Sequence, residues 1–158
     1  MKRRISVLLV FVMVFAVLTG CGSDSVADEL EKFINTDMVG VNAKYDALKT
    51  EMGKWESLES DEALVSSLKD TIMPNIDESL NLLSKIELQT EEVKAIKEKY
   101  KKALDAYKEG FQGILSAVET DGDAEKEMAK LETALTLLDE YNKALEDLAK
   151  EKNMEVKY

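Results

Sequence analysis

The sequence contains no histidine, and among its 158 residues there is one cysteine and one proline. Without histidine, nucleophilic catalysis lacks its usual general base and zinc lacks a usual ligand. A single cysteine, Cys21, excludes an internal disulfide and a cysteine-rich zinc site. No phosphate-binding glycine loop, dinucleotide fingerprint or Gly-x-Ser-x-Gly motif is present. We therefore expect a protein that is not an enzyme and holds no cofactor.

Arginine is also scarce, because it occurs only at positions 3 and 4. The first 20 residues hold three basic residues and no acidic one, which leaves 18 lysines and 32 acidic residues in 21–158, a net charge of −14. Such an excess of negative charge argues against nucleic acid as a partner, since binding to phosphates rewards a basic surface. It also argues against electrostatic adhesion to anionic lipid.

The chain has one long apolar stretch, and it lies at the N-terminus. The basic residues Lys2, Arg3 and Arg4 precede 14 consecutive residues that are apolar or small, from Ile5 to Leu18. A membrane-spanning helix needs about 20 such residues, so the stretch is typical of a cleaved export signal. An uncleaved N-terminal anchor with an incidental cysteine is the alternative.

The residues Leu18-Thr19-Gly20-Cys21 that end this stretch resemble the lipobox of bacterial prolipoproteins. The resemblance implies that residues 1–20 are removed and that Cys21 becomes the lipidated N-terminus, on the outer face of the cell membrane. Two acyl chains hold a protein stably on a bilayer. Residues 21–24 would then form a short tether and residues 25–158 the folded domain. That domain resembles small all-helical lipoproteins of Gram-positive bacteria that carry no assigned activity.

Apolar residues recur in steps of three and four along four runs, at 25–58, 61–86, 91–119 and 124–151. Ser25, Ser60, Thr90 and Asp123 stand where helix N-caps are expected. Short connections between long helices force antiparallel neighbours. The fold class predicted is therefore all-α, an up-down-up-down antiparallel four-helix bundle. An extended helical hairpin that dimerises is the alternative architecture.

Pro74 falls inside the second run, whose apolar stripe keeps its phase across it. Because proline removes one helical hydrogen bond and clashes with the preceding turn, we expect a kinked helix there. The tail from Lys152 to Tyr158 loses the helical period and is expected to fray.

An acidic turn between the third and fourth runs offers a candidate cation site. Its carboxylates are Glu119, Asp121, Asp123 and Glu125. A calcium loop needs more acidic residues at alternate positions, and its glycine stands later in the loop than Gly122 does here. A turn with a capping Asp explains these residues equally well. A di-iron site is disfavoured, because such sites use Glu-x-x-His pairs and the chain has no histidine.

The third run carries the only basic patch of the acidic domain, with Lys94, Lys97 and Lys101 on one helical face. A solvated face is one interpretation, and a contact for an anionic partner such as phospholipid headgroups or teichoic acid is the other. Seven aromatic residues on the stripes pose a similar choice between a packed core, which their spacing favours, and a ligand cavity. They are Phe33, Tyr45, Trp55, Tyr100, Tyr107, Phe111 and Tyr141.

Together these patterns predict a membrane-anchored extracytoplasmic lipoprotein that acts as a non-enzymatic binding or scaffolding bundle. Its partners would be the membrane, through the lipid on Cys21, and an envelope protein or cell-wall polymer. The alternative is a small-ligand or cation carrier, with a site between helices or at the Asp121 loop. A hydrolase would need a deep pocket with two inward carboxylates.

Overall fold

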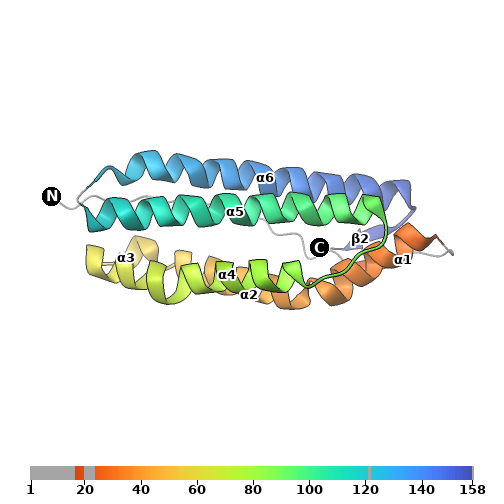
Figure 1. Cartoon of the computed structure of the whole chain (residues 1–158), viewed down its shortest axis with the longest axis horizontal. Helices are drawn as coiled ribbons and strands as arrows, with labels where there is room; N and C mark the ends of the chain where they lie inside the picture. Colours follow the sequence, from red (N-terminus) through yellow and green to blue (C-terminus); the bar gives the residue numbers. More distant parts are fainter. Residues whose placement is uncertain (1–16, 20–23, 121, 158) are drawn as a thin grey trace.

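The computed structural model describes residues 17–19, 24–120 and 122–157. Their body is all-helical, as predicted, and its helices run along the long axis of the molecule (Figure 1). The α-helices are α1 (Ser25–Lys32), α2 (Val39–Met52), α3 (Asp61–Ser67), α4 (Met73–Ser84), α5 (Glu91–Glu119) and α6 (Ala124–Glu151). Shorter elements are the π-helical turns η1 (Phe33–Asp37) and η3 (Leu68–Ile72), the 3-10 turn η2 (Trp55–Ser57), and the strands β1 (Val17–Thr19) and β2 (Glu155–Lys157).

The first predicted run is helical throughout most of its length but is not one regular helix. Its N-cap is Asp24 and not Ser25, because Asp24 has the extended backbone that a cap requires, and its Oδ1 accepts from the Val26 N–H at 2.9 Å. At η1 the Met38 N–H donates to the Phe33 carbonyl at 2.9 Å, a π-helical bond that inserts one residue between α1 and α2.

The second run begins at its predicted cap, since the Ser60 Oγ accepts from the Ala63 N–H at 3.2 Å. A π-helical turn, η3, ends directly before α4, which places Pro74 in the first turn of α4. A missing N–H is tolerated there. The Asn75 side chain also donates to the Thr71 carbonyl at 2.8 Å. The run ends at Ser84, two residues earlier than predicted.

The third and fourth runs form α5 and α6 with the predicted bounds. α5 packs against α6, α2 packs against α4, and α4 contacts α5 (Figure 1). The predicted stripes supply most of the core, including all ten positions of the first run. Those ten are Val26, Leu30, Phe33, Ile34, Met38, Val41, Tyr45, Leu48, Met52 and Trp55.

The seven aromatic residues pack as core. All are buried, and Trp55 meets the Phe111 ring edge-on with 5.7 Å between ring centroids, while Tyr107 stacks on Phe111 at 6.0 Å. Tyr100 and Tyr141 bring α5 and α6 together, with 4.9 Å between their ring centroids. Burial raises the pKa of Tyr100 and Tyr141 well above the ordinary value. Tyr45 of α2 also meets Tyr107, with 6.2 Å between ring centroids, so the aromatic positions tie α2, η2, α5 and α6 into one core.

The C-terminal tail departs from the sequence-based expectation, because it does not fray. Met154 is buried, and the chain turns into β2 through Asn153, whose φ of 55° lies in the left-handed region. β2 pairs antiparallel with β1, with Val17 opposite Lys157. The buried Met154 side chain and the pairing of β2 with β1 hold the tail. Neither contact repeats every three or four residues, so helical periodicity does not reveal it. The partner strand lies within residues 1–20, the predicted signal.

Two glycines of α5 allow α6 to approach closely. A Cβ added at Gly110 would lie 2.6 Å from the Leu131 Cδ2 and 3.4 Å from the Leu131 backbone nitrogen. A Cβ at Gly113 would meet the Glu127 carboxylate. Leu131 is buried in the core and has little room to shift.

We expect Gly110→Ala to destabilise the fold by about 1 kcal/mol, because overpacking against Leu131 outweighs the better helix propensity of alanine. Gly40→Ala is the matched control, since its Cβ would meet only the Leu82 Cδ1 at an ordinary 3.6 Å. Urea unfolding followed by circular dichroism should show Gly40→Ala as stable as the wild type or more stable. A Gly110→Ala variant of undiminished stability would contradict the close approach.

Candidate functional site

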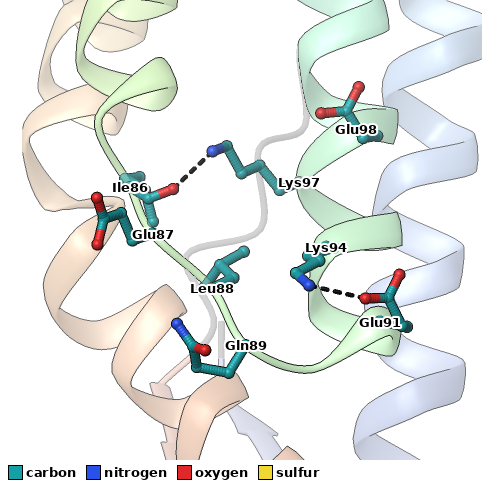
Figure 2. A pocket seen from close by; sticks show the side chains of 8 residues that line it. All are labelled: Ile86, Glu87, Leu88, Gln89, Glu91, Lys94, Lys97 and Glu98. Atoms are coloured by element: carbon teal, nitrogen blue, oxygen red, sulfur yellow. Dashed lines mark hydrogen bonds and ion pairs between the residues drawn. The ribbon is translucent and has the colours of Figure 1, made fainter.

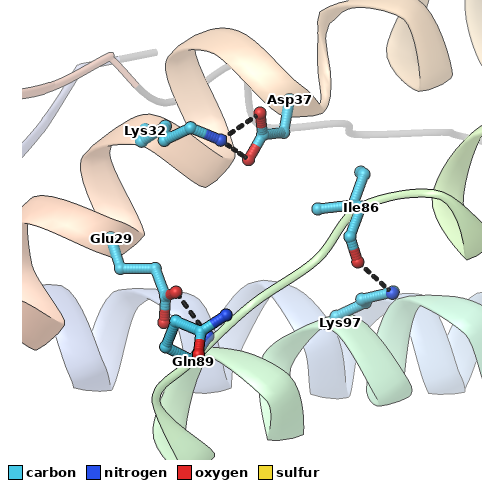
Figure 3. A network of polar contacts seen from close by, with 6 residues as sticks. All are labelled: Glu29, Lys32, Asp37, Ile86, Gln89 and Lys97. Atoms are coloured by element: carbon cyan, nitrogen blue, oxygen red, sulfur yellow. Dashed lines mark hydrogen bonds and ion pairs between the residues drawn. The ribbon is translucent and has the colours of Figure 1, made fainter.

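The Glu29 carboxylate joins α1 to the α4–α5 connection, about sixty residues further along the chain. The Glu29 side chain, on α1, accepts from the Gln89 N–H at 2.6 Å and from the Thr90 N–H at 2.8 Å. It also accepts from the Thr90 hydroxyl. Figure 3 shows the bond between Glu29 and Gln89. Residues 85–90, the α4–α5 connection, are thereby fixed on α1. Glu29 thus accepts from the N–H group of the N-cap residue of α5, one of the donors at a helix start that have no partner within the helix.

Thr90 does stand at the N-cap position of α5, but its side chain makes no capping bond within that helix. The N–H groups at a helix start need acceptors, and a carboxylate there also favours the positive end of the helix dipole. Partial burial raises the pKa of Glu29, yet the bonds from the Thr90 hydroxyl and the two N–H groups outweigh it and hold the pKa below its ordinary value. Glu29 is therefore charged at neutral pH, and through it α1 supplies a charged acceptor at the N-cap position of α5.

A groove of about 590 Å³ lies between the α4–α5 connection and the first turns of α5 (Figure 2). Its lining residues are Ile86, Glu87, Leu88, Gln89, Glu91, Lys94, Lys97 and Glu98. The Lys97 Nζ donates across the groove to the Ile86 carbonyl at 2.6 Å. The Lys94 Nζ forms an ion pair with Glu91 at 2.7 Å. The bond from Lys97 therefore joins the two walls of the groove, whereas the Lys94–Glu91 pair lies within α5.

Of the three lysines predicted as an anionic-partner contact, the structure brings two into the groove. Lys94 and Lys97 line it, whereas Lys101 lies one turn further along α5 and pairs with Asp105 at 2.7 Å. The hydrogen bond to Asp105 raises the pKa of Lys101. The lysines thus alternate with carboxylates and do not form a bare basic patch. A purely anionic partner would meet negative charge at the same surface.

The acidic turn shows no cation site in the part of the chain that the structure describes. Within that part, no group of three or more potential ligands is placed to hold a metal ion. Glu119 instead pairs with Lys69 at 2.5 Å, linking α5 to η3. Asp123 is exposed in the turn, while Asp121 and the side chain of Glu125 lie outside the described residues. The predicted lipidation site, Cys21, also lies outside them.

Sequence analysis missed the residues that shape the groove from outside α5. Glu29 and Gln89 are sixty residues apart, and no local pattern relates them. The same holds for the Lys152 Nζ, which lies 3.1 Å from the Asp24 Oδ2 and joins the end of α6 to the cap of α1. The available signal was Thr90 itself, because a cap residue marks a helix start whose N–H groups need acceptors.

Among the residues described, no helix combines the length and apolar character needed to cross a bilayer. The family model described as "Uncharacterised lipoprotein PM1805" matches residues 27–155, most of the folded domain. The chain therefore belongs to this family of lipoproteins, which supports the lipoprotein prediction. The searches of curated proteins and of solved structures returned no match.

We expect Glu29→Gln to lower the free energy of unfolding by about 1 kcal/mol at pH 7, because α5 loses its charged cap. The pKa of Glu29 is depressed in the folded state, so its contribution is complete above the ordinary value of 4.5. It is lost as the pH falls through the lower folded pKa. Urea unfolding at pH 7 and below pH 4 measures the difference.

Glu31→Gln is the matched control, since it removes the same charge from the same helix and leaves Gln89 and Thr90 with their acceptor. It should cost much less than Glu29→Gln at pH 7. If the two variants unfold alike at pH 7, or if the Glu29→Gln deficit persists undiminished in acid, the carboxylate is not the cap of α5.

Proposed function

We propose that this protein is a lipid-anchored, non-enzymatic binding or scaffolding protein on the outer face of the cell membrane. The observation that carries the proposal is its membership of a lipoprotein family, together with a lipobox-like sequence ending at Cys21, directly before the folded domain. In this proposal residues 1–20 are removed, and β1 with them, so that the buried Met154 remains to hold the C-terminal tail. Cys21 receives the lipid and residues 21–24 form the tether. An envelope protein or a cell-wall polymer is the partner.

The tether is short enough to hold the domain close to the lipid headgroups. Three peptide units separate Cys21 from Asp24, and an extended chain spans at most about 11 Å over that length. Asp24 caps α1 and contacts Lys152, so the anchored end of the domain contains the start of α1 and the end of α6. The α4–α5 connection lies at this end too, beside α1 (Figure 1).

The proposal includes the helix topology predicted from the sequence, an up-down-up-down four-helix bundle with a kink at Pro74. In such a bundle the turns at 53–60 and 120–123 form the far end, away from the membrane. α5 alone has 29 residues, about 44 Å at 1.5 Å per residue. A rod of this length would present exposed helix faces to partners well outside the headgroup layer.

We propose for two reasons that the protein has no catalytic activity. The sequence has no histidine, and its one cysteine is the proposed lipidation site. The aromatic positions that could have lined an interior cavity are filled core. The alternative function is a carrier, and the groove favours a small ligand as its cargo.

Cys21→Ser should move the protein out of the membrane fraction, because the acyl acceptor is lost. The readouts are fractionation of cells and the intact mass of the purified protein, which should show two or more acyl chains and no residues 1–20 in the wild type. Ser25→Ala is the control and should remain in the membrane. A wild-type protein of unprocessed, unacylated mass would contradict the anchor.

The scaffolding role is tested by photocrosslinking in intact membranes. A photoreactive residue replacing Lys102 on α5 or Glu132 on α6, both exposed, should yield a discrete adduct with one envelope component. The same residue placed at buried Leu138 is the control for random capture. Failure of every exposed helix face to give an adduct above that control would contradict a scaffolding role.

A further inference from the structure

We propose that the groove between the α4–α5 connection and α5 binds the zwitterionic phosphoethanolamine headgroup of a membrane phospholipid. The inference deepens the proposed function, since it rests on the domain being held at the membrane by Cys21. Three features carry it: the position of the groove, its alternation of charge, and the fixed geometry of its walls.

The groove lies within reach of the headgroups along a short covalent and hydrogen-bonded path. The tether from Cys21 to Asp24 spans at most about 11 Å. Five residues of helix, about 7.5 Å, then lead from Asp24 to Glu29. Glu29 accepts from the N–H of Gln89, which lines the groove. A lipid neighbouring the anchor can therefore reach the groove without detaching from the bilayer.

The charges of the groove suit a ligand that carries both signs. Lys94 and Lys97 present ammonium groups, and Glu91 and Glu98 on the same helix present carboxylates (Figure 2). An ammonium has three donors, so Lys97 can bind a phosphate oxygen while it still donates to the Ile86 carbonyl. Carboxylates are acceptors for the primary ammonium of ethanolamine. A purely anionic headgroup would satisfy the lysines and be repelled by the glutamates.

The lining also favours an ethanolamine headgroup over a choline headgroup. Proteins recognise quaternary ammonium groups with cages of aromatic rings. None of the eight lining residues is aromatic. A primary ammonium, by contrast, needs hydrogen-bond acceptors, and the carboxylates of the groove supply them. Ile86 and Leu88 add an apolar wall suited to the glycerol carbons and the first methylenes.

The groove is formed before any ligand arrives. Lys97 fixes the connection at Ile86, and Glu29 fixes it at Gln89 (Figure 3). Glu29 also accepts from the Thr90 N–H. Both ends of the segment 86–90 are thus tied to helices. A rigid site loses less conformational freedom on binding than a loop that must first order.

The test uses the full processed lipoprotein in non-ionic detergent, with water-soluble headgroups as probes. Glycerophosphoethanolamine should shift the backbone amide NMR signals of Gln89 and Lys94 in a saturable titration, with a dissociation constant in about the millimolar range. Glycerophosphoglycerol, glycerophosphocholine and inorganic phosphate should each bind at least threefold more weakly. Lys94→Gln and Glu98→Gln should each weaken glycerophosphoethanolamine binding at least threefold.

Lys101→Gln is the matched control, because Lys101 lies on the same helix outside the groove, and it should bind like the wild type. Equal binding of glycerophosphoglycerol or phosphate would overturn the proposal in favour of a simple anion site. Equal binding of glycerophosphocholine, or no shift at Gln89 and Lys94, would overturn it as well. The Cys21→Ser chain should still bind the probe, so failure of the anchor and failure of the headgroup site are distinguishable.

Discussion

The hydrogen bonds between the Glu29 carboxylate and residues 89 and 90 are the constraint on which the anchored end of this structure depends. They supply an acceptor to the N–H of Thr90, the N-cap residue of α5, whose own side chain makes no capping bond. They also hold the α4–α5 connection against α1, and that connection is one wall of the groove. Because α5 contacts α1, α3, α4 and α6, the position of its first turn influences the whole core.

Much of the fold could be predicted from local pattern. The bounds of α5 and α6 follow from helical periodicity that begins at a polar cap and ends at a turn, and the stripe from Val26 to Trp55 is buried at every predicted position. These features depend on residues three or four apart, which interact within one helix. The π-helical turns η1 and η3 escaped prediction, because an extra residue in a helix has no comparable local signature.

The candidate site could be predicted only in part, for a related reason. The lysines of α5 were visible as a patch, and Lys94 and Lys97 do line the groove. The carboxylate that fixes its other wall comes from α1, and the placement of Glu29 depends on how whole helices pack. The tail was misjudged because Met154 is held by tertiary contacts and not by periodicity.

The negative net charge of the protein is consistent with the proposed attachment through a covalent lipid. Residues 21–158, with a net charge of −14, gain nothing from electrostatic attraction to an anionic bilayer, and the family to which the chain belongs is one of lipoproteins. A covalent lipid would overcome that repulsion, and a groove of alternating charge would engage a headgroup without net charge. The long helices would then extend away from the membrane.

The orientation of the bundle on the bilayer tests this account most directly. Since Cys21 is the only cysteine, Gln89→Cys and Glu59→Cys variants of the processed lipoprotein can each be labelled at one site with a fluorophore, in vesicles containing a headgroup-attached quencher. The account predicts strong quenching at position 89 and little at position 59, which lies in the turn at the opposite end. Equal quenching at both positions would show a bundle lying flat on the membrane, and stronger quenching at position 59 would show it inverted. Either result would contradict the account.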